Sequence, residues 1–233
     1  MNIGLFGYGK MGKMIEQIAI NRGHSIVAKI DLNSTKVDYS ETDVAIDFST
    51  PESAFKNITD CFENKVPVVS GTTGWLSNYE DAVNICEEKK GAFIYASNFS
   101  LGVNIFFELN AYLAKMMGNL EQYNVAMEEI HHTQKLDAPS GTAITLAEGI
   151  LAHTPYESWR LDKAEKNVIP ITSKREGNVP GTHTITYESN VDTVEIKHSA
   201  HNREGFALGA VIAAEWIKGR TGVFSMKDVL NLK

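Results

Sequence analysis

One short segment of the chain holds most of the side chains that could do acid–base chemistry. His131, His132 and Lys135 fall within five residues, directly after an apolar run. An imidazole titrates near neutral pH and is the usual general acid or base of an active site. A lysine ammonium attracts an anion and can also donate a proton. The segment therefore predicts an active site that works on an anionic substrate.

A binding site for that anion is predicted a few residues further on. Pro139 and Ser140 are expected to open a helix, with Gly141 and Thr142 in its first turn. Free N–H groups and hydroxyls at a helix N-terminus hold a carboxylate well. Taken singly, these residues also fit a solvated histidine pair, a surface lysine and a helix cap. Their convergence in one segment favours the active site.

A bound metal is the weaker hypothesis for this segment. Adjacent side chains such as His131 and His132 point apart, and no carboxylate partner for them is obvious in the sequence. The two cysteines, Cys61 and Cys86, form no CxxC motif and have no histidine at ligand spacing. We therefore expect no metal, no disulfide framework and a reducing compartment.

The N-terminal end carries a second chemical signal, the glycine pattern of a dinucleotide-binding turn. Residues 7–12 read G-Y-G-K-M-G between an apolar run and a helix-like segment, and Asp31 follows 19 residues after the last glycine. Gly7 permits a tight turn, Gly9 lets the backbone approach a pyrophosphate, and Gly12 lets helix and strand pack closely. The helix N-terminus supplies N–H groups to the anion, and the acid receives the ribose hydroxyls.

Two further turns stand where parallel strands are expected to meet their loops, Ser49-Thr50-Pro51 and Gly71-Thr72-Thr73-Gly74. Ligands of open α/β sheets bind along that carboxyl edge. Ordinary polar turns would explain either one alone, but the small residues of the second suit a close approach to a flat ring.

The elements that must position these residues differ between the two halves of the chain. Strands are expected at 3–6, 25–30, 44–48, 66–69 and 92–96, alternating with helices at 11–21, 51–64 and 79–90. This alternation predicts an α/β fold with a doubly wound parallel sheet. The second half is expected to hold helices at 101–117 and 140–152, and strands at 123–130, 168–173, 183–189 and 193–198. Their spacing predicts a smaller domain with a mixed or antiparallel sheet, before a last helix at 206–217 that returns to the first domain.

Composition excludes several classes of protein. The 233 residues are 43% hydrophobic, which is ample for a buried core, and the formal charge of −7 gives no reason to expect a nucleic-acid partner. No signal-peptide pattern opens the sequence, and no run approaches about 18 uncharged apolar residues. We expect a cytoplasmic protein without a membrane partner.

The sequence resembles the dihydrodipicolinate reductase family across nearly its whole length. The most specific match is the segment 129–142, with its pattern His-His-x-x-Lys-x-Asp-Ala-Pro-Ser-Gly-Thr. The other matching stretches are 7–12, 47–52, 71–74, 97–100, 102–104, 175–177 and 181–184, with Arg203 and Phe206. The resemblance implies a Rossmann-like dinucleotide-binding domain (residues 1–100 with 203–233) and a smaller α+β domain (residues 101–202) that binds substrate and builds a homotetramer.

The resemblance also implies a reaction and roles. A reduced nicotinamide would give a hydride to a small dicarboxylate, 4-hydroxy-tetrahydrodipicolinate, in the diaminopimelate route of lysine biosynthesis. His131 would be the acid/base and Lys135 the proton donor, with His132, Ser140, Gly141 and Thr142 binding the substrate. The residues implied at the cofactor are Gly7, Tyr8, Gly9, Lys10, Met11, Gly12, Asp31, Gly71, Thr72, Thr73, Ala96, Ser97, Asn98, Phe99 and Arg203.

The sequence departs from this family next to the ribose-binding acid. Many relatives place an arginine there, where it meets the 2′-phosphate of NADPH, whereas here Leu32 follows Asp31. Asp31 favours a free 2′-hydroxyl and repels a phosphate. Lys36 or Lys10 could partly compensate, so we expect NADH with NADPH possible.

Two rival hypotheses remain at this stage. An aspartate- or homoserine-type dehydrogenase shares the two-domain plan but leaves the segment 131–142 unexplained. A non-catalytic dinucleotide sensor would need only the glycine turn and would leave Lys135 replaceable.

Overall fold

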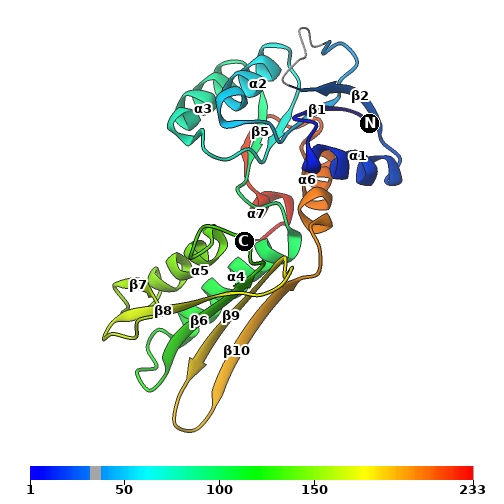
Figure 1. Cartoon of the computed structure of the whole chain (residues 1–233). Helices are drawn as coiled ribbons and strands as arrows, with labels where there is room; N and C mark the ends of the chain where they lie inside the picture. Colours follow the sequence, from blue (N-terminus) through cyan, green and yellow to red (C-terminus); the bar gives the residue numbers. More distant parts are fainter. Residues whose placement is uncertain (32–37, 233) are drawn as a thin grey trace. The chain divides into compact units, whose positions relative to one another are not determined.

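The computed structural model describes residues 1–31 and 38–232, so Leu32 and Lys36 lie outside the described residues. The chain divides into two compact units, drawn in the colours of the sequence in Figure 1. Unit 1 comprises Met1–Leu101 with Glu204–Lys233, and unit 2 comprises Gly102–Arg203.

Unit 1 is built on a six-stranded sheet with the order β11-β5-β4-β3-β1-β2, paired in parallel throughout. Its strands are β1 (Asn2–Phe6), β2 (Ser25–Ile30), β3 (Val44–Asp47), β4 (Val68–Ser70), β5 (Ala92–Tyr95) and β11 (Gly222–Phe224). This is the doubly wound parallel sheet that the alternating sequence pattern predicted. The strand order reverses between β1 and β3, and doubly wound sheets bind their ligands at such a point.

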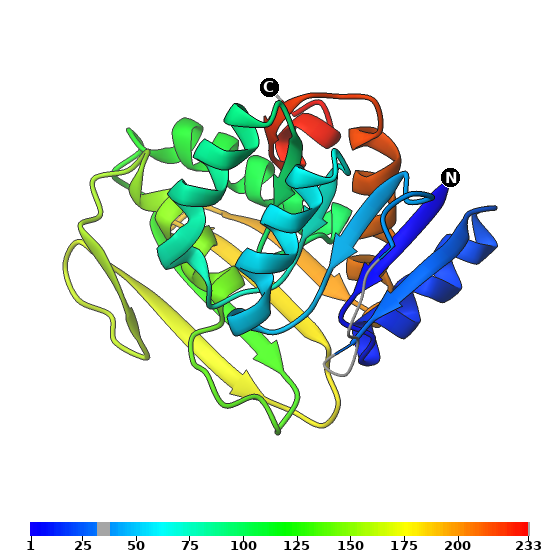
Figure 2. The ribbon, with the colours of Figure 1, turned by 90° about the horizontal axis from the view of Figure 1, so that it is seen from above.

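Helices cover both faces of this sheet. They are α1 (Lys10–Asn21), α2 (Pro51–Glu63), the short 3₁₀ helix η1 (Leu76–Asn78), α3 (Tyr79–Glu88), α6 (Glu204–Ile217) and α7 (Met226–Val229). Val44 and Ile46 of β3 pack in one core with α1 and α6, whereas Ala45 between them packs in a second core with α2 and α3. Figure 1 shows α6, in orange, beside α1, in blue, and Figure 2 shows the helices on the two sides of the strands.

Unit 2 is a five-stranded mixed sheet with the order β10-β9-β6-β8-β7. Its strands are β6 (Asn124–His131), β7 (Ser158–Leu161), β8 (Val168–Arg175), β9 (Gly181–Glu188) and β10 (Thr193–Ala200). β6 pairs parallel with β8 and antiparallel with β9, so it occupies the middle of the sheet. Helices α4 (Leu101–Met117) and α5 (Gly141–Leu151) share one apolar core with these strands.

Four elements had no counterpart in the sequence pattern, namely β7, η1, β11 and α7. Each spans only three or four residues. So short a segment cannot show the periodicity by which a strand or helix is recognised, and both strands lie at a sheet edge where burial is one-sided. Among the described residues, no helix is long and apolar enough to span a membrane.

Candidate active site

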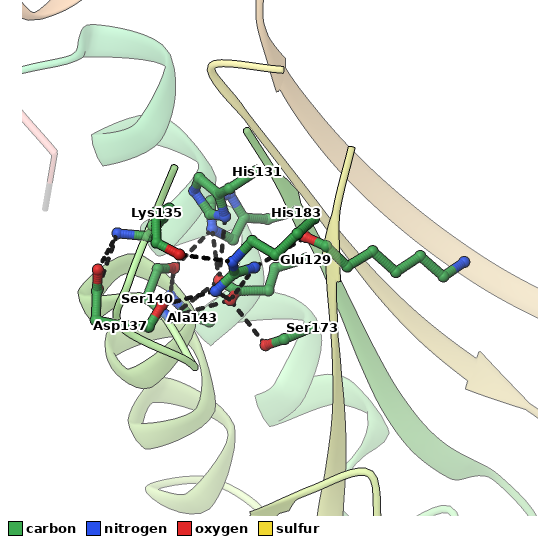
Figure 3. A network of polar contacts seen from close by, with 10 residues as sticks. Glu129, His131, Lys135, Asp137, Ser140, Ala143, Ser173 and His183 are labelled. Carbon is green, nitrogen blue, oxygen red and sulfur yellow. Dashed lines mark hydrogen bonds and ion pairs between the residues drawn. The ribbon is translucent and has the colours of Figure 1, made fainter. Parts of the chain in front are cut away.

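Strand β6 carries the predicted catalytic segment into the covered face of unit 2. Alternate residues of β6 point to that face, and Val125 and Met127 join the apolar core there. Glu129 and His131 continue the same row and are 0% and 7% exposed, respectively. Figure 3 shows the two side chains meeting His183, which comes from the neighbouring strand β9. The strand thus ends by burying two ionisable groups.

Glu129 is the centre of a polar network (Figure 3). Its carboxylate accepts hydrogen bonds from the backbone N–H of Ser140, at 3.2 and 3.1 Å, and from the hydroxyl of Ser173, at 2.8 Å. The guanidinium of Arg175 donates to Oε1 at 3.4 Å, and His131 Nδ1 and His183 Nε2 each lie 3.6 Å from Oε2. Burial alone would raise the pKa of Glu129, but the surrounding donors hold that pKa below its ordinary value. Glu129 is therefore a buried anion.

The ring of His131 is enclosed on several sides. It meets the ring of His183 edge to face, with 5.1 Å between the centroids. Its Nε2 lies beside Gly181, where an added side chain would crowd it. Burial lowers the pKa of His131 to about 4, although the facing carboxylate of Glu129 works in the opposite direction. His131 is therefore a neutral imidazole at pH 7.

The loop after β6 presents Lys135 as a cation at the edge of this network. Its Nζ donates to both carboxylate oxygens of Asp137 at 2.8 Å, and the Lys135 side chain is 21% exposed. The loop itself is held by Arg175, whose guanidinium donates to the backbone carbonyls of Asp137, at 2.6 Å, and of Lys135, at 3.3 Å. Lys135 is accessible to a substrate, and its backbone is fixed.

Helix α5 begins directly beside the network. Ser140 is its N-cap, and the Ser140 Oγ accepts from the N–H of Ala143 at 3.2 Å and lies 3.1 Å from Nε2 of His183. Gly141, the first residue of the helix, is exposed, and no atom lies within 4 Å of where its Cβ would be. Thr142 follows, partly buried, in the same turn. The open helix N-terminus is suited to an anion, while the buried Ser140 side chain is engaged in capping.

His132 and Arg203 lie together, although 71 positions separate them in the sequence. Both line a pocket of about 350 Å³ in unit 2, with Gln134, Asn178, Pro180, His201 and Asn202. Arg203, which was expected at the cofactor, thus lies beside His132, which was expected at the substrate. The lining is rich in hydrogen-bond donors and carries the full charge of Arg203, which suits an acidic small molecule.

The structure supplies the carboxylate partner that the sequence did not reveal for a metal site. Ligand atoms of Glu129, His131 and His183 all lie within 4.8 Å of one another. However, the carboxylate of Glu129 already accepts from Ser140, Ser173 and the cationic Arg175. The positive charge of Arg175, which already pairs with this carboxylate, would repel a metal cation. The cluster is therefore better described as a network of donors around the Glu129 anion than as a metal centre.

Four members of the network had been given no role from the sequence: Glu129, Ser173, Arg175 and His183. A signal for two of them was present. Glu129 stands in phase with Val125 and Met127 along β6, and His183 stands in phase with Ile185 and Tyr187 along β9. A polar residue at the buried phase of an otherwise apolar strand predicts a partnered, buried group. Arg175 and Ser173 carried no such signal.

The predicted dinucleotide turn lies in unit 1 at the point where the strand order reverses. Gly7 has a φ of 87° and lies so close to the backbone of Phe48 that a Cβ would overlap its carbonyl oxygen. A Cβ on Gly12 would overlap the carbonyl oxygen of Gly7. By contrast, no atom lies within 4 Å of the Cβ position of Gly9, the N-cap of α1. Two glycines are required by the fold, and the third leaves free space in front of a helix N-terminus.

A buried acid joins two of the predicted loops at this edge of the sheet. Asp47, at the end of β3, accepts from the hydroxyls of Ser49 at 2.6 Å, Ser70 at 2.8 Å and Thr72 at 2.7 Å. The N–H of Ser49 also donates to Thr72 Oγ1 at 2.8 Å. Burial raises the pKa of Asp47 even though these hydroxyls stabilise its charged form. The turn at Gly71–Thr73 is thereby fixed to the loop that follows β3.

The remaining residues expected at the cofactor also lie in unit 1. Ala96 follows β5 and donates its N–H to the carbonyl of Ser70 at 3.2 Å, while Phe99 is buried against Gly209 of α6. Asn98 accepts from the N–H of Ser100 at 2.9 Å. The others are exposed or partly buried, namely Tyr8, Lys10, Met11, Asp31, Thr73 and Ser97.

Family models match both parts of the chain. The model described as "Dihydrodipicolinate reductase, N-terminus" matches residues 1–99, and "Dihydrodipicolinate reductase, C-terminus" matches residues 102–230. Together they span nearly the whole sequence.

Similar proteins carry a consistent name. A 4-hydroxy-tetrahydrodipicolinate reductase of Christiangramia forsetii is 61% identical over 99% of this chain and 98% of its own length. One of Buchnera aphidicola is 36% identical over 94% of this chain and 81% of its own length. Among solved structures, a dipicolinate-bound dihydrodipicolinate reductase from Paenisporosarcina sp. TG-14 superposes with a TM-score of 0.82 at 23% identity, covering 100% of this chain and 99% of that one, which bears on the fold alone.

Proposed function

This chain belongs to the dihydrodipicolinate reductase family, and from that premise we propose which of its residues bind and which carry out the chemistry. The chain is an NAD(P)H-dependent reductase of 4-hydroxy-tetrahydrodipicolinate, in the diaminopimelate route of lysine biosynthesis. The roles of the two units and of the individual side chains remain to be assigned.

We assign the dinucleotide to unit 1 and the substrate to unit 2. The space in front of Gly9, at the N-terminus of α1, fits a pyrophosphate. The turn at Gly71–Thr73 and the segment Ala96–Phe99 lie at the carboxyl edge of the same sheet, where a nicotinamide would bind. In unit 2, the open N-terminus of α5 at Gly141 and Thr142 and the pocket of His132 would hold the two carboxylates of the substrate.

The observation that carries the catalytic assignment is the difference between His131 and Lys135. A bound nicotinamide would supply a hydride to the substrate ring, whose 4-hydroxyl must leave as water, and the electron-rich ring that results takes up a proton. His131 is neutral because its pKa is about 4, so at pH 7 it lacks the acidic imidazolium proton that a general acid would give. The Lys135 ammonium lies at the accessible edge of the network, paired with Asp137. Lys135 is therefore the proton donor, and His131 is suited to accept a proton or a hydrogen bond.

We propose that NADH is the preferred cofactor. Asp31 follows β2 directly and is exposed, where it would accept from the ribose hydroxyls and repel a 2′-phosphate. Lys29, the nearest basic residue on β2, is paired with Glu16 at 2.6 Å and donates to the hydroxyl of Tyr8. Its charge is thus largely offset. Of the two lysines expected to compensate, Lys10 is exposed on α1, and Lys36 lies outside the described residues.

The first experiment is a coupled assay in which pyruvate and aspartate semialdehyde are condensed in situ, with NADH or NADPH followed at 340 nm. Cofactor should be consumed only when the condensation product is present, and kcat/KM should favour NADH. Asp31→Ser should lower kcat/KM for NADH by about 10-fold or more, because charge-assisted hydrogen bonds contribute roughly 1.5–3 kcal/mol each. The same change should leave kcat/KM for NADPH equal or higher. A wild-type preference for NADPH would overturn the assignment of Asp31, and binding without consumption would favour the non-catalytic sensor.

We further propose that the enzyme is a cytoplasmic homotetramer assembled through unit 2. Helices α4 and α5 share a core with the sheet, and the opposite phase of β10 (Thr193, Glu195, Lys197 and Ser199) is exposed. The two cysteines are unpaired and buried, in keeping with a reducing compartment. Light scattering on the purified protein should give a mass about four times the 25.7 kDa of the chain. A single-chain mass at working concentration would refute the tetramer.

A further inference from the structure

Glu129 occupies a position where an apolar side chain would serve the fold. It follows Val125 and Met127 on the buried phase of β6 and is 0% exposed. Placing a carboxylate there removes it from water, a cost that ion pairing alone rarely offsets. Because it is fully buried, Glu129 does not contact solvent or a bound molecule. Its function must therefore act through its neighbours.

Three of those neighbours belong to different parts of the proposed site. The oxygen Oε2 faces Nδ1 of His131 at 3.6 Å, and Nδ1 of His131 has no hydrogen-bond partner among the described residues. Both oxygens accept from the N–H of Ser140, the residue that caps α5. The carboxylate thus touches the imidazole and the start of the anion-binding helix at once.

The third neighbour, Arg175, extends the network to Lys135. Its guanidinium binds Glu129 Oε1 at 3.4 Å on one side, and on the other side it donates to the carbonyls of Asp137 at 2.6 Å and Lys135 at 3.3 Å. Leu136, between those two residues, is 98% exposed and packs against nothing that would hold the loop. Besides the backbone hydrogen bond from the N–H of Thr133 to the carbonyl of Gly177, the loop is anchored by this charged contact, and Glu129 supplies its negative charge.

We propose that Glu129 is a positioning residue for the reduction, because its buried carboxylate orients His131 directly and fixes the Lys135 loop through Arg175. This inference rests on the proposed function, in which Lys135 gives the proton. Loss of the carboxylate would leave the guanidinium and the imidazole without their partner, and a displacement of about 1 Å at the reacting groups can cost about 100-fold in rate.

The test is Glu129→Gln, which keeps the shape of the side chain and removes its charge. We expect kcat in the coupled assay to fall by about 10–100-fold, while the Kd for NADH, read from its fluorescence, stays within about two-fold. The matched control is Glu128→Gln on the same strand. Glu128 lies on the opposite phase and pairs with Lys174 at 2.6 Å, so its variant should keep wild-type kcat.

A double-mutant cycle separates positioning from loss of fold. Arg175→Gln should also lower kcat. The double variant, Glu129→Gln with Arg175→Gln, should have a kcat within about two-fold of the slower single variant, because both changes remove the same interaction. Multiplicative losses, or a folded Glu129→Gln with wild-type kcat, would overturn the inference. If Glu129→Gln does not fold, Arg175→Gln alone decides, and an unchanged kcat counts against it. An inactive wild-type protein would instead refute the proposed function, so the two failures are distinguishable.

Discussion

Replacing Lys135 with alanine is expected to lower kcat by about 100- to 10,000-fold, the range typical of a lost general acid. The reduced ring needs a proton after it accepts the hydride, and the neutral His131, with a pKa of about 4, lacks an acidic imidazolium proton at pH 7. Water would remain as the donor, at a random distance and orientation. Single-turnover oxidation of bound NADH, followed at 340 nm, measures this step directly.

The same variant should leave the dinucleotide and the fold nearly untouched. Lys135 belongs to unit 2 and contacts Asp137 at an exposed loop, so its removal exposes no apolar core. We expect the Kd for NADH to stay within about two-fold and the melting temperature to change little, because the partly buried Lys135 side chain pairs only with the exposed carboxylate of Asp137. Lys163→Ala, at another exposed turn of unit 2, controls for the loss of a surface charge. Turnover of Lys135→Ala at the wild-type rate would remove Lys135 from the mechanism.

Gly7→Ala should lose stability and Gly9→Ala should lose cofactor binding, although the two glycines stand two residues apart. At Gly7 the methyl would overlap the carbonyl oxygen of Phe48, and the φ of 87° disfavours any L side chain. Strain of about 1–3 kcal/mol and overpacking of similar size should lower the stability of unit 1 on the order of 3 kcal/mol. Thermal unfolding should show that loss even without cofactor.

Gly9→Ala should fold normally and bind NADH poorly. Gly9 has a φ of −82°, which any residue adopts, and its Cβ would meet no atom within 4 Å. The methyl would instead fill the space assigned to the pyrophosphate, so we expect a Kd for NADH at least about 10-fold higher, equivalent to about 1.4 kcal/mol. The melting temperature without cofactor should match that of the wild type. A Gly9→Ala variant that binds NADH normally would place the pyrophosphate elsewhere.

Several features of the fold and of the site could be predicted from residues that are neighbours in the sequence. The alternation of apolar runs with helices predicted the doubly wound sheet, because it is a property of neighbouring residues. The segment from His131 to Thr142 was conspicuous for the same reason, since its ionisable and hydroxyl residues are close together in the sequence. Even the burial of Glu129 was present in the phase of β6.

What the sequence could not specify is which distant strands would meet. Glu129 finds Ser173 and Arg175 because β8 lies on one side of β6, and it finds His183 because β9 lies on the other. Those partners stand 44, 46 and 54 positions away, and no spacing rule relates them.

The sequence by itself thus determined the longer elements of each unit and singled out the glycine turn and the proposed acid–base segment, because local propensity and periodicity encode them. The tertiary structure decided which groups carry charge. Burial makes His131 neutral in spite of the facing carboxylate of Glu129, and the strand order brings Arg175 to the backbone of the Lys135 loop. Close contact with Phe48 gives Gly7 a structural requirement that Gly9 does not have. Each of these depends on desolvation or on contact across the sheet, which exist only once the chain has folded.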